Sequence, residues 1–342
     1  MSKTNRNPVI SLSRSLGMLF IVICHIIKYY HFIPGHSILG QFFSCGVPLF
    51  IFISGYLYSN RKIICFHKWY LKRFISISIP AIIVSLTVIS ILLIMEYKID
   101  ITTVMVYLLD LEGLVFISWK WFSKIMVEVP SLGPLWFTTV IMLCYLLIPI
   151  LSWFFDNLLS RNYKLFSFTF LAVGAIVSFL VHPYFSLSYF FFFAIGYLCG
   201  RLEFLDKVNT FIFVKYSILA LMSMIVRVIL NKYIDETNLY TSIAPLLQFF
   251  VGTWFVVFFA YVYTKNPHII NRIAESNVVN LCDGYSYYVY LVHGCFCMGR
   301  FNMYQLLPLV WATIVFSVCT AISAIVVKFI SEIIQKNLLK RI

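Results

Sequence analysis

Runs of about twenty apolar residues recur along the whole chain, and they limit the folds open to it more than any other feature. A helix of that length crosses the hydrocarbon core of a bilayer with its backbone polar groups satisfied. Hydrophobic residues make up 61% of the 342 residues and charged residues 11%, against about a quarter in soluble domains. The sequence therefore predicts an all-α integral membrane protein, one transmembrane domain over 1–342 with no appended soluble domain.

The spacing of these runs predicts a bundle of about ten transmembrane helices, with no segment between them long enough for a soluble domain. The expected helices cover 9–31, 41–59, 74–97, 134–155, 165–181, 185–200, 210–230, 242–264, 284–298 and 307–329. The longest connection, 98–133, carries Trp119 and Trp121. These tryptophans fit an interfacial aromatic belt, or a stacking platform for a sugar.

The basic residues are unevenly divided between the two sides of this arrangement. With the N-terminus in the cytoplasm, the inner segments hold 19 of the 26 lysines and arginines, and acidic residues balance the remaining seven on the outer side. This asymmetry predicts that both termini and the loops 60–73, 156–164, 201–209 and 265–283 are cytoplasmic, and that 98–133 faces outward. The net charge of +13 is thus a topology signal, and no nucleic-acid partner is needed to explain it.

The nine cysteines favour neither a metal site nor a disulfide framework. Their number is odd and their spacing irregular, and Cys295 and Cys297 form a lone C-x-C without the other half of a zinc site. We expect them to be small packing residues, and we expect no metal and no permanently bound cofactor.

Two polar residues mark the ends of the first apolar run, "RSLGMLFIVICH", which spans 14–25. Arg14 and His25 are eleven positions apart, three helical turns plus about 20°, so both lie on one stripe of one helix, roughly 16 Å apart along its axis. Intramembrane polar residues normally face the interior of a bundle or a water-filled cavity. We therefore expect this stripe to line a cavity.

Each residue also has a plainer explanation when taken alone. Arg14 could be an anchor at the interface, and His25 could hydrogen-bond a neighbouring helix. Together they suit a two-sided reaction, because a guanidinium binds phosphates at the inner face and an imidazole takes a proton from a hydroxyl deeper in the membrane. A phosphorylated donor with a long arm would connect the two.

Six segments, in order, resemble the acyltransferase 3 family of membrane-bound acyltransferases. The first is the Arg–His pair on the opening helix. The others are "GVPLFIFISGYLYS" (46–59), "LKRFISISIP" (71–80), "LWFTTVIMLCYLLIPIL" (135–151), "YFFFFAIGYLCGR" (189–201) and "YSYYVYLVH" (285–293). Each apolar segment is a weak signal alone. Their order and the Arg–His spacing make the resemblance specific over nearly the whole chain.

The resemblance implies about ten helices, acetyl-CoA or another acyl-CoA as cytoplasmic donor, and a hydroxyl acceptor on a lipid-linked or surface glycan. It implies a multi-pass protein of the bacterial inner membrane, of the O-antigen or exopolysaccharide O-acetyltransferase type. His25 would be the catalytic base, with Arg14 and Arg73 contacting the donor phosphates. The residues expected to line the site or stabilise the oxyanion are Ser54, Tyr56, Trp136, Tyr290 and His293.

The sequence departs from the family pattern at two places. Members usually carry aspartate three residues before the arginine of the first helix, where this chain has Ser11. A second arginine is often found between Arg73 and Pro80, where this chain has FISISI. If the missing aspartate orients the arginine, this chain must orient Arg14 by other means.

Two other functional classes fit the same helices. A glycan or lipid-glycan exporter would also need a polar-lined cavity, although it has no need of a base at one depth. A catalytically inactive scaffold of an assembly complex is the third interpretation. Release of CoA with labelling of the glycan would separate the enzyme from the exporter.

Overall fold

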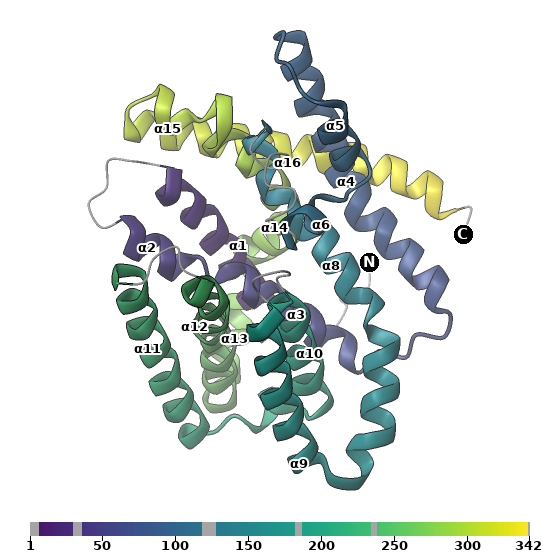
Figure 1. Cartoon of the computed structure of the whole chain (residues 1–342), viewed down its shortest axis with the longest axis vertical. Helices are drawn as coiled ribbons and strands as arrows, with labels where there is room; N and C mark the ends of the chain where they lie inside the picture. The colour runs from purple at the N-terminus through teal and green to yellow at the C-terminus, as the bar shows by residue number, and fades with distance from the viewer. Residues whose placement is uncertain (1–6, 30–35, 118–127, 182–186, 234–237, 341–342) are drawn as a thin grey trace. The chain divides into compact units, whose positions relative to one another are not determined.

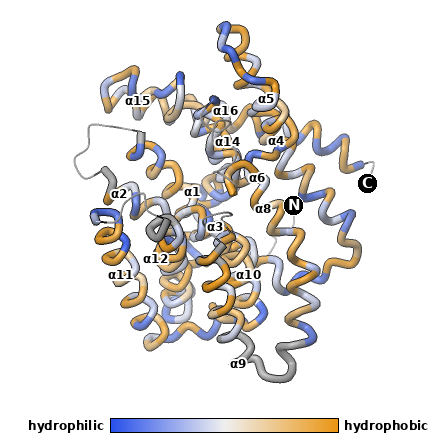
Figure 2. The backbone as a smooth tube through the Cα atoms, viewed as in Figure 1, coloured by the Kyte–Doolittle hydropathy of each residue, from blue (hydrophilic) through white to orange (hydrophobic). Residues whose placement is uncertain are grey.

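The computed structural model describes residues 7–29, 36–117, 128–181, 187–233 and 238–340, and every regular element within these ranges is helical (Figure 1). Most helices are hydrophobic along much of their length (Figure 2). Together with the candidate membrane spans, this confirms an all-α membrane protein. The chain forms two compact units, the first from residues 1–24, 37–62 and 147–286 and the second from 25–36, 63–146 and 287–342.

Seven segments of the described chain are long and apolar enough to cross a membrane. They are Pro8–Lys28, Ile38–Ser59, Phe66–Ile94, Pro130–Asn157, Thr210–Tyr233, Ser242–Lys265 and Leu309–Leu339. The expected ranges 165–181, 185–200 and 284–298 also fall mainly on helices but do not appear among these seven. A bundle of about ten spans therefore stays a prediction.

The expected cytoplasmic loop at 156–164 is wrong as a loop. Helix α9 runs without a break from Ile148 to Val181, through all nine of these residues. The stretch is polar but contains neither glycine nor proline, and polarity alone does not end a helix. At the start of the stretch, the Asn157 amide donates to the Trp153 carbonyl one turn back, and Asp156 pairs with Arg201.

In the first unit, α3 (Gly46–Ser59) and α10 (Ser188–Arg201) lie side by side with their backbones nearly touching (Figure 1). A β-carbon added at Gly55 would come within 2.1 Å of the Phe193 carbonyl oxygen, and one added at Gly196 within 2.1 Å of the Phe52 carbonyl oxygen. Small residues permit such close packing where two helices meet in a membrane. Any larger side chain at either glycine would force these two helices apart.

The first unit contains further α-helices besides this pair. They are α2 (His36–Phe43), α9, α11 (Thr210–Tyr233), α12 (Asn238–Lys265) and α13 (Pro267–Ala274). Helix α9 contacts α3 and α10, and α12 contacts α3, α11 and α13. The expected loop 265–283 is largely helical, because it contains α13 and the start of α14 (Asn277–Cys297).

The second unit is built on α4 (Phe66–Ile94), which packs against α8 (Trp136–Leu146) and α16 (Leu309–Leu339). In the described part of the expected loop 98–133 lie α5 (Ile101–Leu108), α6 (Glu112–Ile117) and the start of η1 (Pro130–Leu135). Trp119 and Trp121 lie outside the described residues. Short α15 (Met303–Leu306) packs on α16.

Two helices contribute residues to both units. Helix α1 (Pro8–Tyr29) passes from the first unit to the second after Cys24, and α14 (Asn277–Cys297) does so after Ser286. The polar residues of the opening apolar run therefore divide between the units, Arg14 in the first and His25 in the second.

Candidate active site

His25 of α1 and His293 of α14 form a hydrogen-bonded pair within the second unit. Nδ1 of His25 lies 2.7 Å from Nε2 of His293, and the two rings are nearly parallel, with an interplanar angle of 5°. His293 is fully buried, whereas His25 is half-buried. Two imidazoles in contact share one proton between the facing nitrogens, so the remaining contacts of the pair decide which nitrogen carries it.

The backbone fixes the proton arrangement of the neutral pair. Nδ1 of His293 lies 2.6 Å from the carbonyl oxygen of Tyr290, and because a carbonyl can only accept, this Nδ1 carries the proton. Nε2 of His293 is then an acceptor, and Nδ1 of His25 donates to it. Nε2 of His25 consequently bears the lone pair. A general base requires this state, an imidazole nitrogen ready to accept a proton and held by a partner behind the ring.

An aromatic wall adjoins the histidine pair. The Tyr290 ring lies 5.7 Å from that of His293 and 5.3 Å from that of Phe137, between centroids. The Tyr290 hydroxyl donates to the Pro134 carbonyl, so this candidate oxyanion donor is already engaged within the protein. The rings of Trp136 and Phe116 stack with their centroids 3.9 Å apart. The Trp136 indole is therefore part of the contact between α6 and α8.

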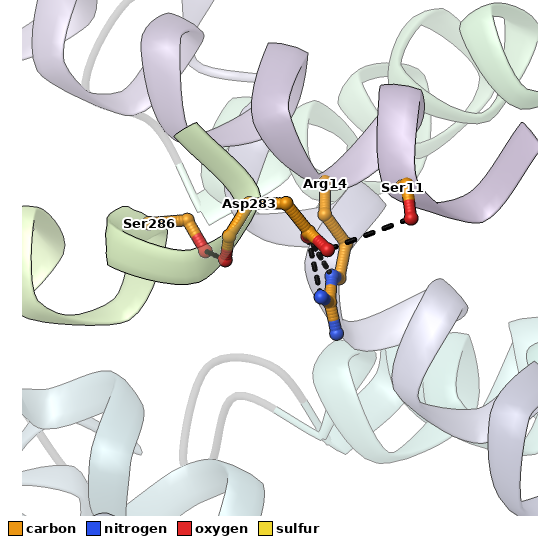
Figure 3. Close-up of polar contacts among 4 residues, drawn as sticks. All are labelled: Ser11, Arg14, Asp283 and Ser286. Atoms are coloured by element: carbon orange, nitrogen blue, oxygen red, sulfur yellow. Dashed lines mark hydrogen bonds and ion pairs between the residues drawn. The ribbon is translucent and has the colours of Figure 1, made fainter. Parts of the chain in front are cut away.

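Arg14 is held by a carboxylate that the sequence did not identify. Nε of Arg14 donates to Oδ1 of Asp283 at 2.7 Å, and Nη2 donates to the same oxygen (Figure 3). The Asp283 side chain is 1% exposed and that of Arg14 is 34% exposed. Ser286, one turn along α14, donates to the Asp283 carbonyl at 3.0 Å. Asp283 is thus the buried, fixed partner of the two.

This pairing leaves one side of the guanidinium for a ligand. The carboxylate takes Nε and one proton of Nη2, whereas Nη1 makes no hydrogen bond to a described residue. An arginine fixed in this way presents the Nη1–Nη2 edge in one orientation, and that edge matches the spacing of two phosphate oxygens. Ser11, in the place where family members carry aspartate, points to the same carboxylate, with Oγ 3.5 Å from Oδ2 of Asp283 (Figure 3).

The remaining predicted residues are spread over both units. Ser54 and Tyr56 lie half-buried on α3 in the first unit. Arg73 lies on α4 in the second, its guanidinium 6.0 Å from the centre of the Trp69 ring. The structure thus groups Tyr290 and His293 with His25 in the second unit.

The sequence holds one weak signal for Asp283, its spacing from His293. Asp283 lies ten residues before His293, almost the separation of Arg14 from His25, and it stands in a helix that also carries a motif histidine. We expected the helix to begin at residue 284, which placed the aspartate in a loop. In the structure α14 begins at Asn277, so Asp283 lies in its second turn.

A second polar cluster lies in the second unit, where two carboxyls of the connection 98–133 meet two threonines of the candidate span Pro130–Asn157. Asp110 and Glu112 are buried and contact the hydroxyls of Thr138 and Thr139. Burial raises the pKa of Asp110, and burial together with the charge of Asp110 raises the pKa of Glu112 well above its usual range. The cluster tethers α6 to α8. The Thr139 hydroxyl of α8 accepts from the Gly113 amide of α6 at 3.0 Å and donates to the Asp110 carbonyl at 2.8 Å.

Because these two carboxyls have raised pKa values, the free energy of unfolding of the protein should fall as the pH rises. Unfolded carboxyls titrate near pH 4, so above that pH the folded state holds more protons than the unfolded chain. The stabilising contribution is complete below about pH 4 and is lost as the pH rises through the raised pKa of Glu112. Glu112→Gln, which imitates the protonated form, should flatten the decline in melting temperature between about pH 5 and 8. Glu332→Gln, at an exposed carboxyl, should leave the slope unchanged, and an equal slope in both variants would contradict the assignment.

Comparison with known families agrees with the helical bundle and with the motifs. The sequence model of the acyltransferase 3 family, described as an acyltransferase domain, matches residues 7–331, nearly the whole chain. No curated protein and no solved structure gives a significant match. The match includes residues of both units, among them the histidine pair (His25 and His293) and the ion pair (Arg14 and Asp283). The chain belongs to the acyltransferase 3 family of membrane-bound acyltransferases.

Proposed function

We propose that this membrane acyltransferase moves an acetyl or other acyl group from cytoplasmic acyl-CoA to a hydroxyl of an envelope glycan, such as O-antigen or exopolysaccharide, in a bacterial inner membrane. The observation that carries the proposal is the histidine pair. His293 donates to a backbone carbonyl and accepts from His25, which leaves Nε2 of His25 as a base. Acyl transfer to an alcohol needs one such base beside the attacking oxygen.

The proposed reaction uses His25 first as a base and then as an acid. The sugar oxygen attacks the thioester carbonyl carbon while its proton passes to Nε2 of His25. The tetrahedral intermediate then collapses, the carbon–sulfur bond breaks, and the sulfur takes the proton back from His25. The products are an O-acyl sugar and free CoA. His293 is a positioning residue, because it holds the tautomer and ring orientation of His25 without touching the substrate.

Arg14 is proposed to bind a phosphate of the donor. Its open Nη1–Nη2 edge suits the diphosphate or ribose phosphate of CoA. Asp283 fixes that edge, and as a buried carboxylate it also keeps the guanidinium from being an unpaired charge in the membrane when no donor is bound. Arg73 is proposed as a second phosphate contact.

The proposal is tested with purified protein in liposomes, given radiolabelled acetyl-CoA and deacetylated glycan. We expect label in the glycan and an equal amount of released CoA, both absent in His25→Ala. Movement of unlabelled glycan across the bilayer with no release of CoA would show an exporter instead. Release of CoA without labelled glycan would point to a different acceptor.

Asp283 and Ser11 supply a test of how Arg14 is held. Asp283→Ser should raise the KM for acyl-CoA, because the guanidinium loses its fixed partner. Ser11→Asp alone should lower the amount of folded protein, since a second carboxylate would then stand beside that of Asp283, whose Oδ2 lies 3.5 Å from the Ser11 hydroxyl. The double variant, Ser11→Asp with Asp283→Ser, moves the carboxylate to α1 three residues from Arg14, within reach of its side chain.

We expect the double variant to recover most of the donor affinity that Asp283→Ser loses. The measurement is KM for acyl-CoA at saturating acceptor in all four proteins, read as a double-mutant cycle. If the two changes add without recovery, Asp283 acts on the fold and does not orient Arg14.

A further inference from the structure

A groove of about 370 Å³ lies in the second unit between α4, α14 and α16. Eleven of its fourteen lining residues are hydrocarbon side chains. Its floor is buried, with Val84 3% and Val88 7% exposed. Its rim is open, with Ile91 42% and Ile322 57% exposed. The groove therefore opens onto the outer surface of the helices that form it.

That surface is in contact with lipid. Helices α4 and α16 are both candidate membrane spans, so their exposed side chains meet the hydrocarbon of the bilayer. The groove offers little to a polar ligand, and the Thr87 hydroxyl on its wall already donates to the Ile83 carbonyl at 2.8 Å. The ligand that fits is a hydrocarbon chain which enters sideways from the membrane.

The groove also lies beside the proposed catalytic pair. Val292, Cys295 and Phe296 of α14 line it, and His293 follows Val292 directly on the same helix. At 100° per residue, His293 is about a quarter of a turn from the groove-lining stripe of α14. A chain seated in the groove is thus held against the helix whose histidine orients His25.

We propose that this groove binds the hydrocarbon tail of a lipid-linked glycan acceptor, an inference that rests on the proposed function. The side opening favours the acceptor over the donor, because acyl-CoA is water-soluble and comes from the aqueous phase, whereas a lipid-linked glycan is already dissolved in the bilayer. Its tail would anchor the molecule along α14 and leave its sugar hydroxyls to reach Nε2 of His25.

Photolabelling tests occupancy without relying on catalysis. The probe is a polyprenyl diphosphate disaccharide with a diazirine in its tail, added to the full-length protein in nanodiscs. We expect label on peptides of α4, α14 and α16 that line the groove, displaced by unlabelled probe. A phospholipid carrying the same diazirine should label these peptides much less. Equal labelling by the phospholipid, or label elsewhere, would overturn the inference.

A matched pair of tryptophan variants tests its part in the reaction. Ser323 lines the groove, whereas Ala321 is exposed on the opposite face of α16. The measured quantity is the ratio of kcat/KM for the tailed disaccharide to kcat/KM for the same disaccharide without its tail. Ser323→Trp should lower this ratio about tenfold, which corresponds to the loss of two buried methylenes of the tail. Ala321→Trp should leave this ratio unchanged, and an equal drop in both would also overturn the inference.

The two proposals fail separately. If the probe labels the groove but the wild-type protein transfers no acyl group, the proposed function is wrong and the binding site stands. If acyl transfer occurs with equal kcat/KM for the tailed and tail-less acceptors, the proposed function stands and the groove is not the acceptor site.

Discussion

Replacing His25 by alanine is expected to lower kcat for acyl transfer by about 10² to 10⁴, the usual contribution of a general base, while the inserted protein remains at its normal level. His293 acts one step behind it. His293→Leu, which cannot accept from Nδ1 of His25, should lower kcat by about 10 to 100-fold, as for partners that fix the tautomer of metal-bound histidines. KM for acyl-CoA should change little in both.

His293→Gln separates orientation from packing. Glutamine and leucine fill similar volumes, but only the amide oxygen of glutamine can accept the His25 proton. We expect Gln to retain much more activity than Leu, with folded protein measured in each by size-exclusion chromatography in detergent. Equal loss in both variants would mean that His293 is a packing residue and that the hydrogen bond does not set the state of His25.

Inserting one alanine between Leu19 and Phe20 is expected to abolish transfer almost completely. The insertion turns His25 by about 100° relative to Arg14. Arg14 is bound to Asp283 and His25 to His293, and both partners belong to the single helix α14. With both helices regular, one of the two pairs must then break.

A four-residue insertion at the same point is the matched control. It turns His25 by about 40° and lengthens the separation by roughly 6 Å, so the facing sides are nearly kept. If activity depends mainly on Arg14 and His25 lying on the same side of α1, the four-residue insertion should lower transfer less than the one-residue insertion. If it depends mainly on the distance that the donor must span between them, both insertions should be equally inactive. Transfer is measured per inserted molecule. Near-normal transfer in the one-residue insertion, with no bulge in α1, would contradict joint action of Arg14 and His25.

The sequence is sufficient to predict the helices, because a run of apolar residues has few alternatives to a spanning helix in a membrane. It is less informative where two helices join. Residues 156–164 look like a loop because they are polar, yet they continue α9, since only glycine, proline or a capping arrangement would end it. The start of α14 is misplaced for the same reason, because Asn277, Asn280 and Asp283 lie inside the helix.

The candidate site divides in a similar way. His25, Arg14 and His293 stand out because a polar residue within an apolar helix has a high energetic cost. Asp283 does not stand out, because its importance depends on a residue 269 positions away. No local periodicity encodes such a pairing, and the substitution of serine at position 11 indicates only that another partner is needed. The tautomer of His25 depends on a backbone carbonyl, which any sequence would supply.

The separation of Arg14 from Asp283 also has a consequence in time. A ribosome adds about 5 to 20 residues per second, so the 269 residues between them take about 13 to 54 seconds to synthesise. Throughout that interval α1 is already available for insertion while its arginine lacks the carboxylate that later neutralises it. The nascent helix must keep its guanidinium among the lipid headgroups. Biogenesis of this enzyme should accordingly be most sensitive to anionic lipid content before α14 emerges.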